Sequence, residues 1–324
     1  MAKQPDSPSQ PTPFRTSIGG QALIEGILMR GPEKQAIVVR KPDGDLVTKV
    51  DELHLIKERH PILGVPLIRG TVNFLDSMVK GVQALMYSAE FYPEDEEEDS
   101  PAEPSKFEAW LEQKLGSEKF MKVLIAFAVV LGIGFSVCLF ILLPAFLGGL
   151  LQKVVDSYLV CNLLEGAVRI VIFLLYLFLC SKQKDMKRVF AYHGAEHKTI
   201  FCYERGLELT VDHVREMPRH HPRCGTSFLF VVLVLSILLF SVVQVESVLL
   251  QMVIKLLLLP ILVSVTYEIN RFVGRHDTAL TRVITAPGLW LQNFTTNEPD
   301  DSMIEVGIAS LKAVLPDQKG QDAW

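Results

Sequence analysis

Long runs of apolar residues dominate the chain between about residues 120 and 270. The first, from Val123 to Leu151, carries no charge and exceeds the roughly 20 residues that a helix needs to cross the hydrocarbon core of a bilayer. Shorter runs follow over 159–180, 227–243 and 248–267. The pattern predicts four membrane-spanning helices, the first ended or kinked at Pro144, because proline lacks the amide hydrogen that continues a helix.

Three charged residues interrupt these runs. Glu165 and Arg169 are four residues apart and share one face of a helix, so we expect them to neutralise each other and to face other helices. The fourth run contains Lys255. A structural ion pair is the favoured interpretation. Transport through these three residues is the weakest one, because four spans per chain are few for a transport path.

Lys and Arg residues predict the orientation, since they are enriched in cytoplasmic loops. The segment 181–223 carries nine of them, the connection between the first two runs has only Lys153, and the connection between the last two has none. We therefore expect the long loop and both termini in the cytoplasm, in a multi-pass protein of the cell membrane. A three-span alternative, with the fourth run re-entrant, would place the C-terminal tail outside.

The segment before the apolar runs reads as a small α+β part. Ala36–Val39 and Leu46–Val50 are β-prone and flank Pro42-Asp43-Gly44, which predicts a hairpin. From 66 to 92, apolar residues recur every three or four positions, the period of an amphipathic helix. We expect this helix to pack on protein, because its polar face lacks the Lys and Arg excess of a membrane-surface helix.

These patterns together predict a mainly α fold: a four-span helical bundle with a small N-terminal α+β cytoplasmic part. Ser302 and Glu305 can form a capping box that opens a last helix to about Leu315. The predicted parts are a disordered N-terminus (1–13), the α+β part (14–92), an acidic linker (93–104), a membrane domain (105–272) containing the cytoplasmic loop 181–223, and a cytoplasmic C-terminal tail with the final helix (273–324).

Composition narrows the function classes. Mean hydropathy is +0.29, and the net charge of −5 comes largely from the acidic run at 94–99. No basic stripe points to nucleic acid. The scattered positions of the five cysteines argue against a disulfide framework, and the N-terminus lacks the charged-then-apolar start of a signal peptide. Glycines at 19–26 are not followed by Gly-Lys-Ser/Thr, so a phosphate-binding loop is disfavoured.

The sequence His193-Gly194-Ala195-Glu196-His197 is the main chemical signal. Residues 185–205 read as one helix ended by Gly206, and positions i and i+4 share a helix face, so both imidazoles can reach one cation. The H-x-x-E-H order is that of the inverzincin peptidases. This predicts a divalent metal, zinc above others, with His193 and His197 as ligands and Glu196 as general base.

Zinc requires a third ligand, and the segment 219–225 is the richest source of one. His221 and Cys224 are the candidates that we carry forward. His213 is weaker, and Glu204 lies about 10 Å further along the same helix, too far for one small ion. Five of the eight histidines fall between residues 193 and 221, which favours a shared site.

Two other interpretations stay open at this point. The two histidines could simply be solvated or bonded to nearby carboxylates at the membrane surface. Cys224 could also act as a nucleophile beside a histidine, although its Gly-Thr-Ser neighbours suit a helix start equally well.

Several segments together resemble the YqhQ-like bacterial membrane proteins (domain of unknown function 1385), which are often labelled predicted metal-dependent enzymes. The segments that carry the resemblance are Gly20–Gly26 with Met29–Gly31, Tyr192–Lys198, His221–Ser227, and Pro287–Gln292 with Glu298–Asp301. They extend over most of the chain. The resemblance implies an integral protein of the bacterial cytoplasmic membrane and provides no substrate.

We therefore expect an integral membrane protein that acts as a metal-dependent, zinc-type hydrolase at the cytoplasmic face. The alternative is a non-catalytic membrane scaffold, an assembly or insertion factor. The lipid bilayer is the expected partner in both cases, with a membrane protein or a peptide as a further partner.

Overall fold

The computed structural model describes residues 14–53, 60–92, 116–241, 245, 247–318 and 320–323. The predicted disordered terminus (1–13) and acidic linker (93–104) lie outside these residues. The described chain forms two compact units. The first combines residues of 14–92, 177–236 and 260–323, and the second combines residues of 116–176 and 237–259.

A four-stranded antiparallel sheet forms the centre of the first unit, in the order β1 (Gly19–Leu23), β2 (Gly26–Arg30), β3 (Lys34–Arg40) and β4 (Leu46–Glu52). The predicted hairpin is confirmed as β3 and β4, and Gly44 provides the positive φ of 94° in its turn. The strands β1 and β2 form a second hairpin, in which Ile24 and Glu25 connect the pair Leu23 and Gly26.

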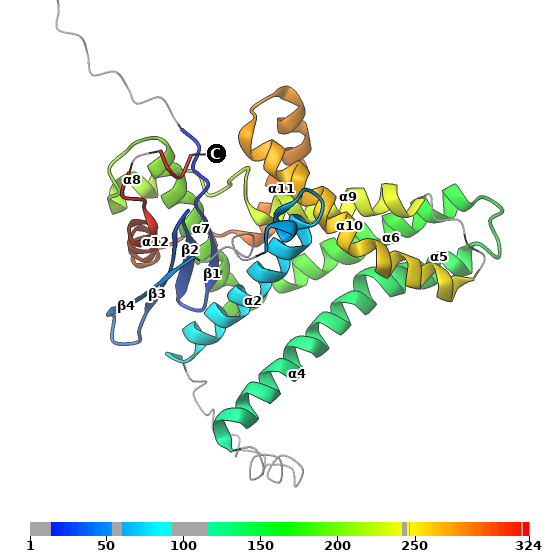
Figure 1. Ribbon diagram of the computed structural model, residues 1–324, viewed down its shortest axis with the longest axis horizontal. Helices are drawn as coiled ribbons and strands as arrows, with labels where there is room; N and C mark the ends of the chain where they lie inside the picture. The colour runs from blue at the N-terminus through cyan, green and yellow to red at the C-terminus, as the bar shows by residue number, and fades with distance from the viewer. Residues whose placement is uncertain are drawn as a thin grey trace, which may run out of the picture. The chain divides into compact units, whose positions relative to one another are not determined.

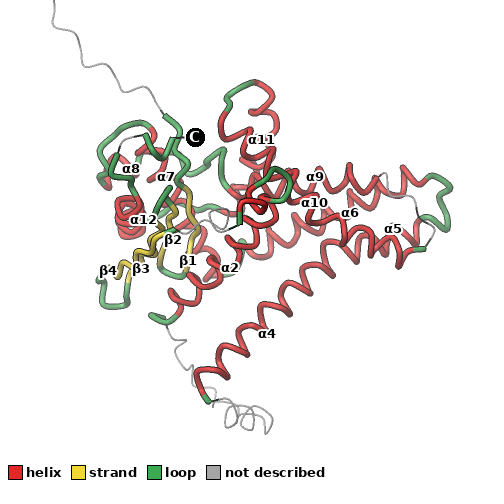
Figure 2. The backbone as a smooth tube through the Cα atoms, in the orientation of Figure 1, coloured by secondary structure: helices red, strands yellow, loops and turns green. Residues whose placement is uncertain are grey.

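Helices cover both faces of this sheet (Figures 1 and 2). Side chains alternate between the two faces along a strand, so each strand contributes to two layers. One layer packs against α7 (Lys184–Glu204) and α12 (Asp301–Val314), and the other against α2 (Arg69–Ala89). The first layer includes Ile27, Met29, Ala36 and Val38 with Tyr192, Ala195, Val306 and Leu311; the second includes Leu23, Leu28, Ile37 and Val39 with Ala84.

The C-terminal half of α2 packs on the sheet, as the amphipathic pattern of the sequence predicted. At its N-terminal end it contacts α10 (Val248–Arg275), where the Arg69 guanidinium donates to both oxygens of Glu268. The Thr71 hydroxyl donates to the Pro260 carbonyl at 2.8 Å. These bonds hold α2 between the sheet and the C-terminal part of α10.

Three helical segments, not the four that we predicted, have the length and apolar character typical of membrane spans in the described chain: Val123–Leu151, Tyr158–Cys180 (α6) and Val248–Arg275 (α10). The remaining apolar run forms α9 (Gly225–Ser241) with 17 residues. At 1.5 Å per residue it rises about 26 Å, short of the roughly 30 Å of hydrocarbon. The predicted count of four spans is therefore corrected to three.

Pro144 does not end the first span. The helix continues from α4 (Ser117–Val137) through a π-helical turn (Cys138–Leu142) into α5 (Leu143–Leu151). Pro144 lies in the first turn of α5. A wider turn can absorb the proline without breaking the helix.

The predicted pair of Glu165 and Arg169 is confirmed, at 2.8 Å, and both side chains are buried within the second unit. Lys255 joins them, since its ammonium lies 2.6 Å from each oxygen of Glu165. One carboxylate thus serves two buried cations in the apolar unit.

The described part of the C-terminal tail contains two helices. The sequence predicted the last one, α12, but its N-cap is Asp300, whose carboxylate accepts from the Met303 amide at 3.0 Å. The predicted capping box of Ser302 and Glu305 was therefore wrong, because the N-cap lies two residues earlier in the chain. The other helix, α11 (Ala279–Thr295), was not predicted. Two short elements complete the fold: a 3-10 turn (Pro61–Gly64) and α8 (Val211–Arg215).

Candidate metal centre

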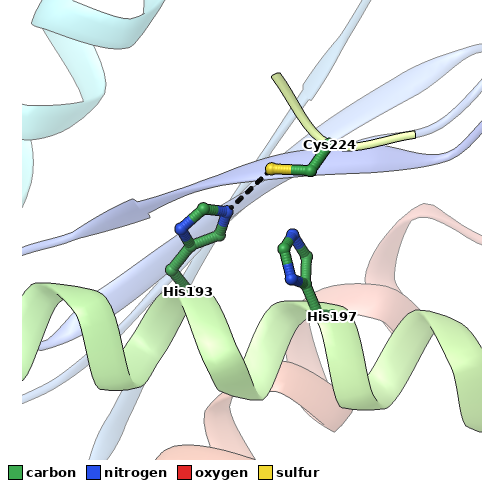
Figure 3. Close-up of side chains that lie close together, drawn as sticks. All are labelled: His193, His197 and Cys224. Carbon is green, nitrogen blue, oxygen red and sulfur yellow. Dashed lines mark hydrogen bonds between the residues drawn. The ribbon is translucent and has the colours of Figure 1, made fainter. Parts of the chain in front are cut away.

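The helix α7 holds both histidines of the H-x-x-E-H sequence, and it ends as predicted just before Gly206, whose φ is 67°. The imidazole rings of His193 and His197 point the same way from adjacent turns, with centroids 4.3 Å apart (Figure 3). Much of α7 is buried between the sheet and the C-terminal tail. The two rings are therefore held by packing on both sides.

Gly194 has a structural role in this arrangement. A Cβ atom at this position would lie 2.1 Å from the carbonyl oxygen of Asn297. The absence of a side chain lets the segment after α11 run along α7, where the Asn297 amide donates to the Phe190 carbonyl at 2.8 Å. This segment brings the Thr295 carbonyl to the His193 ring.

Backbone carbonyls orient both imidazoles. His193 Nδ1 lies 2.8 Å from the Thr295 carbonyl oxygen, and His197 Nδ1 lies 2.6 Å from the Arg219 carbonyl oxygen. A carbonyl only accepts, so each Nδ1 carries the proton and each Nε2 presents a lone pair in the neutral ring. Histidine ligands of metals are commonly oriented by such a second bond.

Cys224 completes the group. It precedes α9, and its Sγ lies 3.1 Å from His193 Nε2 (Figure 3). One ligand atom from each of His193, His197 and Cys224 lies within 4.8 Å of the others. The sequence left His221 and Cys224 open as the next ligand, and the structure brings Cys224 into the group.

Glu196 faces the same cavity, which has a volume of about 400 Å³. Its Oε1 accepts from the Gly20 amide of β1 at 2.9 Å. Its Oε2 is buried and, like His197 Nε2, has no hydrogen-bond partner among the described residues. Burial raises the pKa of Glu196, which makes its carboxylate a better proton acceptor.

The surroundings of Cys224 favour its thiolate form. Burial opposes ionisation of Cys224, but the neighbouring His193 and His197 bring its pKa well below 9.0. Burial also opposes protonation of His193, yet the Cys224 sulfur raises the pKa of that imidazole to about 9. The thiolate is the form in which cysteine binds metals.

His221 lies beside the group and has a different partner. Gln292 of α11 fixes its backbone: the Gln292 side chain accepts from the His221 amide at 2.7 Å and donates to its carbonyl at 2.8 Å. The His221 Nε2 lies 3.5 Å from Glu204 Oε2. Burial lowers the pKa of His221 to about 4, so its ring is neutral near pH 7.

The helical rise predicted that Glu204 lies too far from the two histidines to be a ligand of the same ion. In the structure Glu204 has other partners. It bonds to the Arg223 guanidinium and accepts from the Thr16 amide at 2.9 Å. Burial opposes its ionisation, but His221 and Arg223 together leave the pKa of Glu204 lowered. Glu204 thus anchors the segment 219–225 that carries Cys224.

The donor set suits zinc. Two imidazole nitrogens and one thiolate are common zinc ligands, and three protein ligands leave a fourth position open, as in catalytic sites. His197 Nε2 is a buried acceptor that a cation would satisfy. His193, His197 and Cys224 would hold the ion, and Glu196 would lie beside the open position.

Comparison with known proteins places the chain in a family. Residues 65–317 match the family described as "Protein of unknown function (DUF1385)", and the chain belongs to it. Among curated proteins, the chain is similar to "Uncharacterized protein YqhQ" of Bacillus subtilis (strain 168), with 31% identity over 302 residues that cover 92% of each chain. No solved structure matches the chain.

Proposed function

We propose that this protein is a zinc-dependent hydrolase at a membrane surface, with His193, His197 and Cys224 as ligands and Glu196 as general base. The observation that carries the proposal is the pair of buried atoms His197 Nε2 and Glu196 Oε2, which lack partners among the described residues. Buried polar atoms nearly always have a partner. A cation and a water molecule would satisfy both atoms at once.

The residues have defined roles in hydrolysis. A bound zinc ion supplies a Lewis acid and lowers the pKa of water. Glu196 accepts a proton from the attacking water as its oxygen bonds to the acyl carbon, and then passes that proton to the leaving group as the scissile bond breaks. The Gly20 amide holds Glu196 Oε1, so Oε2 is the oxygen that moves the proton.

A cysteine nucleophile explains less of the site. It would use the close contact between Cys224 and His193. It would leave His197 Nε2, oriented by the Arg219 carbonyl, and Glu196 Oε2 without a role. The metal proposal uses all four side chains.

The location that we propose is the cytoplasmic face of the cell membrane. The Lys- and Arg-rich segment 181–223 supports it through the positive-inside rule. The helix α12 packs with α7 on one face of the sheet, so the sheet, α7 and the C-terminal tail share one side of the membrane. Because α9 is too short to span the bilayer alone, we propose that α9 and α10, which lie between α7 and α12 in the chain, enter the bilayer together and return to the same side as a hairpin.

Glu196→Gln tests the catalytic role. We expect this variant, purified in lipid nanodiscs, to keep its zinc. It should hydrolyse a quenched-fluorescent peptide mixture at least about 100-fold more slowly than wild type. Glu208→Gln, on an exposed carboxylate, serves as the control and should match wild type. Undiminished hydrolysis by Glu196→Gln would refute the assignment of the base. Absence of zinc from the wild type would favour the scaffold function instead.

A further inference from the structure

The strand β1 has a free edge. It lies at the end of the sheet and pairs only with β2. The Gly20 amide points away from β2 and donates to Glu196, so Gly20 and its partner Met29 form a non-hydrogen-bonded pair of the ladder. Hydrogen-bonded and non-hydrogen-bonded pairs alternate along two antiparallel strands. The backbone N–H and C=O groups of both Gly20 and Ala22 therefore point outward from the sheet. Within the described chain no group bonds the Ala22 amide from that side.

This edge lines the cavity of the candidate metal centre. Gly20 and Ala22 are among its lining residues, together with His193, Glu196 and Cys224. Both edge residues are small, and Gly20 is exposed. A molecule that approaches Glu196 along β1 therefore meets backbone groups rather than side chains.

We infer that the substrate is an extended polypeptide segment that adds to the free edge of β1, and this inference rests on the proposed hydrolase function. Outward amide and carbonyl groups on every second residue match the spacing of another extended backbone. The Gly20 amide is already bonded to Glu196, so the added segment pairs with the Gly20 carbonyl and the Ala22 amide, which places one of its peptide bonds beside Glu196.

The charges of the cavity favour a neutral peptide over a lipid phosphate. Arg223 is the one Lys or Arg among the described residues that line it, and that guanidinium is bonded to Glu204. Apolar side chains line much of the rest: Ile18, Val189, Phe190, Ile200 and Leu229. Leucine-like side chains of a peptide fit this lining.

The opposite edge of the sheet provides a matched control. The Arg40 amide of β3 donates to the Glu25 carbonyl, on the β2 side, and Arg40 pairs with Leu46 of β4. By alternation the amide of Thr48 points outward from β4, as the amide of Ala22 does from β1. Thr48 is exposed and is not among the residues that line the cavity.

The test measures binding of a fluorescein-labelled peptide amide, Leu-Ser-Leu-Ser-Leu, by anisotropy. The protein carries Glu196→Gln, so that it binds without cleaving, and stands in lipid nanodiscs. A series of peptides carries one N-methyl group on each backbone amide in turn. Strand addition predicts that methylation at alternate positions weakens binding about tenfold and that the intervening positions change little.

A proline substitution at the edge strand is the second test of strand addition. Ala22→Pro removes an outward amide while leaving the ladder to β2 intact, and should weaken binding of the unmodified peptide about tenfold. Thr48→Pro should bind it as the parent protein does. Equal effects of methylation at all positions overturn the inference even if Ala22→Pro does not fold.

Zinc content measured on the same samples separates the two proposals. If the protein binds zinc but N-methylation shows no alternating effect, strand addition is refuted and the proposed hydrolase function is retained. The alternating pattern without zinc supports the edge as a peptide site and removes the hydrolase.

Discussion

Gly194→Ala tests how the fold supports the candidate metal centre. The new Cβ would lie 2.1 Å from the Asn297 carbonyl oxygen, so α7 and the tail segment must separate. Overpacking of this kind costs about 1–3 kcal/mol, and loss of the bond between the Asn297 amide and the Phe190 carbonyl adds about 1 kcal/mol. The helix propensity of alanine returns about 1 kcal/mol. The net destabilisation is therefore about 1–3 kcal/mol.

The same movement withdraws the Thr295 carbonyl from His193. Loss of such an outer bond lowers metal affinity about 10- to 100-fold. Thermal unfolding in detergent measures the first effect, and competition with a chromophoric zinc chelator measures the second. Gly225→Ala is the local control, since nothing lies within 4 Å of a Cβ at that position. A Gly194→Ala protein with the unfolding temperature and zinc affinity of wild type would refute the reasoning.

Three further predictions concern the rest of the fold. Glu165→Gln leaves Lys255 and Arg169 buried without their carboxylate and should cost about 3–5 kcal/mol, visible as a lower unfolding temperature; an unchanged temperature contradicts the buried triad. Asp300→Ala removes the cap of α12 and should cost about 1 kcal/mol at pH 7. Burial opposes ionisation of Asp300, but hydrogen bonds from Ser302 and Met303 keep its pKa below 3.8. The difference in unfolding free energy between wild type and Asp300→Ala should therefore persist above about pH 4 and vanish as the pH falls through the folded pKa. A difference that grows on acidification contradicts the cap. Green fluorescent protein fused to the C-terminus should fluoresce, whereas a fusion to alkaline phosphatase should be inactive; an active phosphatase places the tail outside.

Local patterns in the sequence predicted several elements correctly. The turn at Pro42-Asp43-Gly44 and the helix ended by Gly206 are examples, because their signals lie within a few residues of chain. The helix α11 was missed because Pro287 and Gly288 resemble loop residues. In the folded chain a Cβ on Gly288 would lie 2.4 Å from Ser227, so the glycine serves a close helix contact rather than a turn.

The candidate site was predictable only in part. The spacing of His193 and His197 predicted a shared face, and Cys224 was one of two open choices for the next ligand. The carbonyls of Thr295 and Arg219 orient the rings, and no residue type encodes a backbone contact of that kind. The contribution of β1 was also hidden, since Gly20 reaches Glu196 through its amide across 176 positions of the chain.

Zinc analysis of purified protein tests the central claim most directly. The account predicts about one zinc ion per chain in the wild type and in His221→Gln, and none in His197→Ala or Cys224→Ala. Folding of each variant is checked by its unfolding temperature with excess chelator present. A wild type without zinc, or a folded His197→Ala protein that keeps its zinc, would contradict the account.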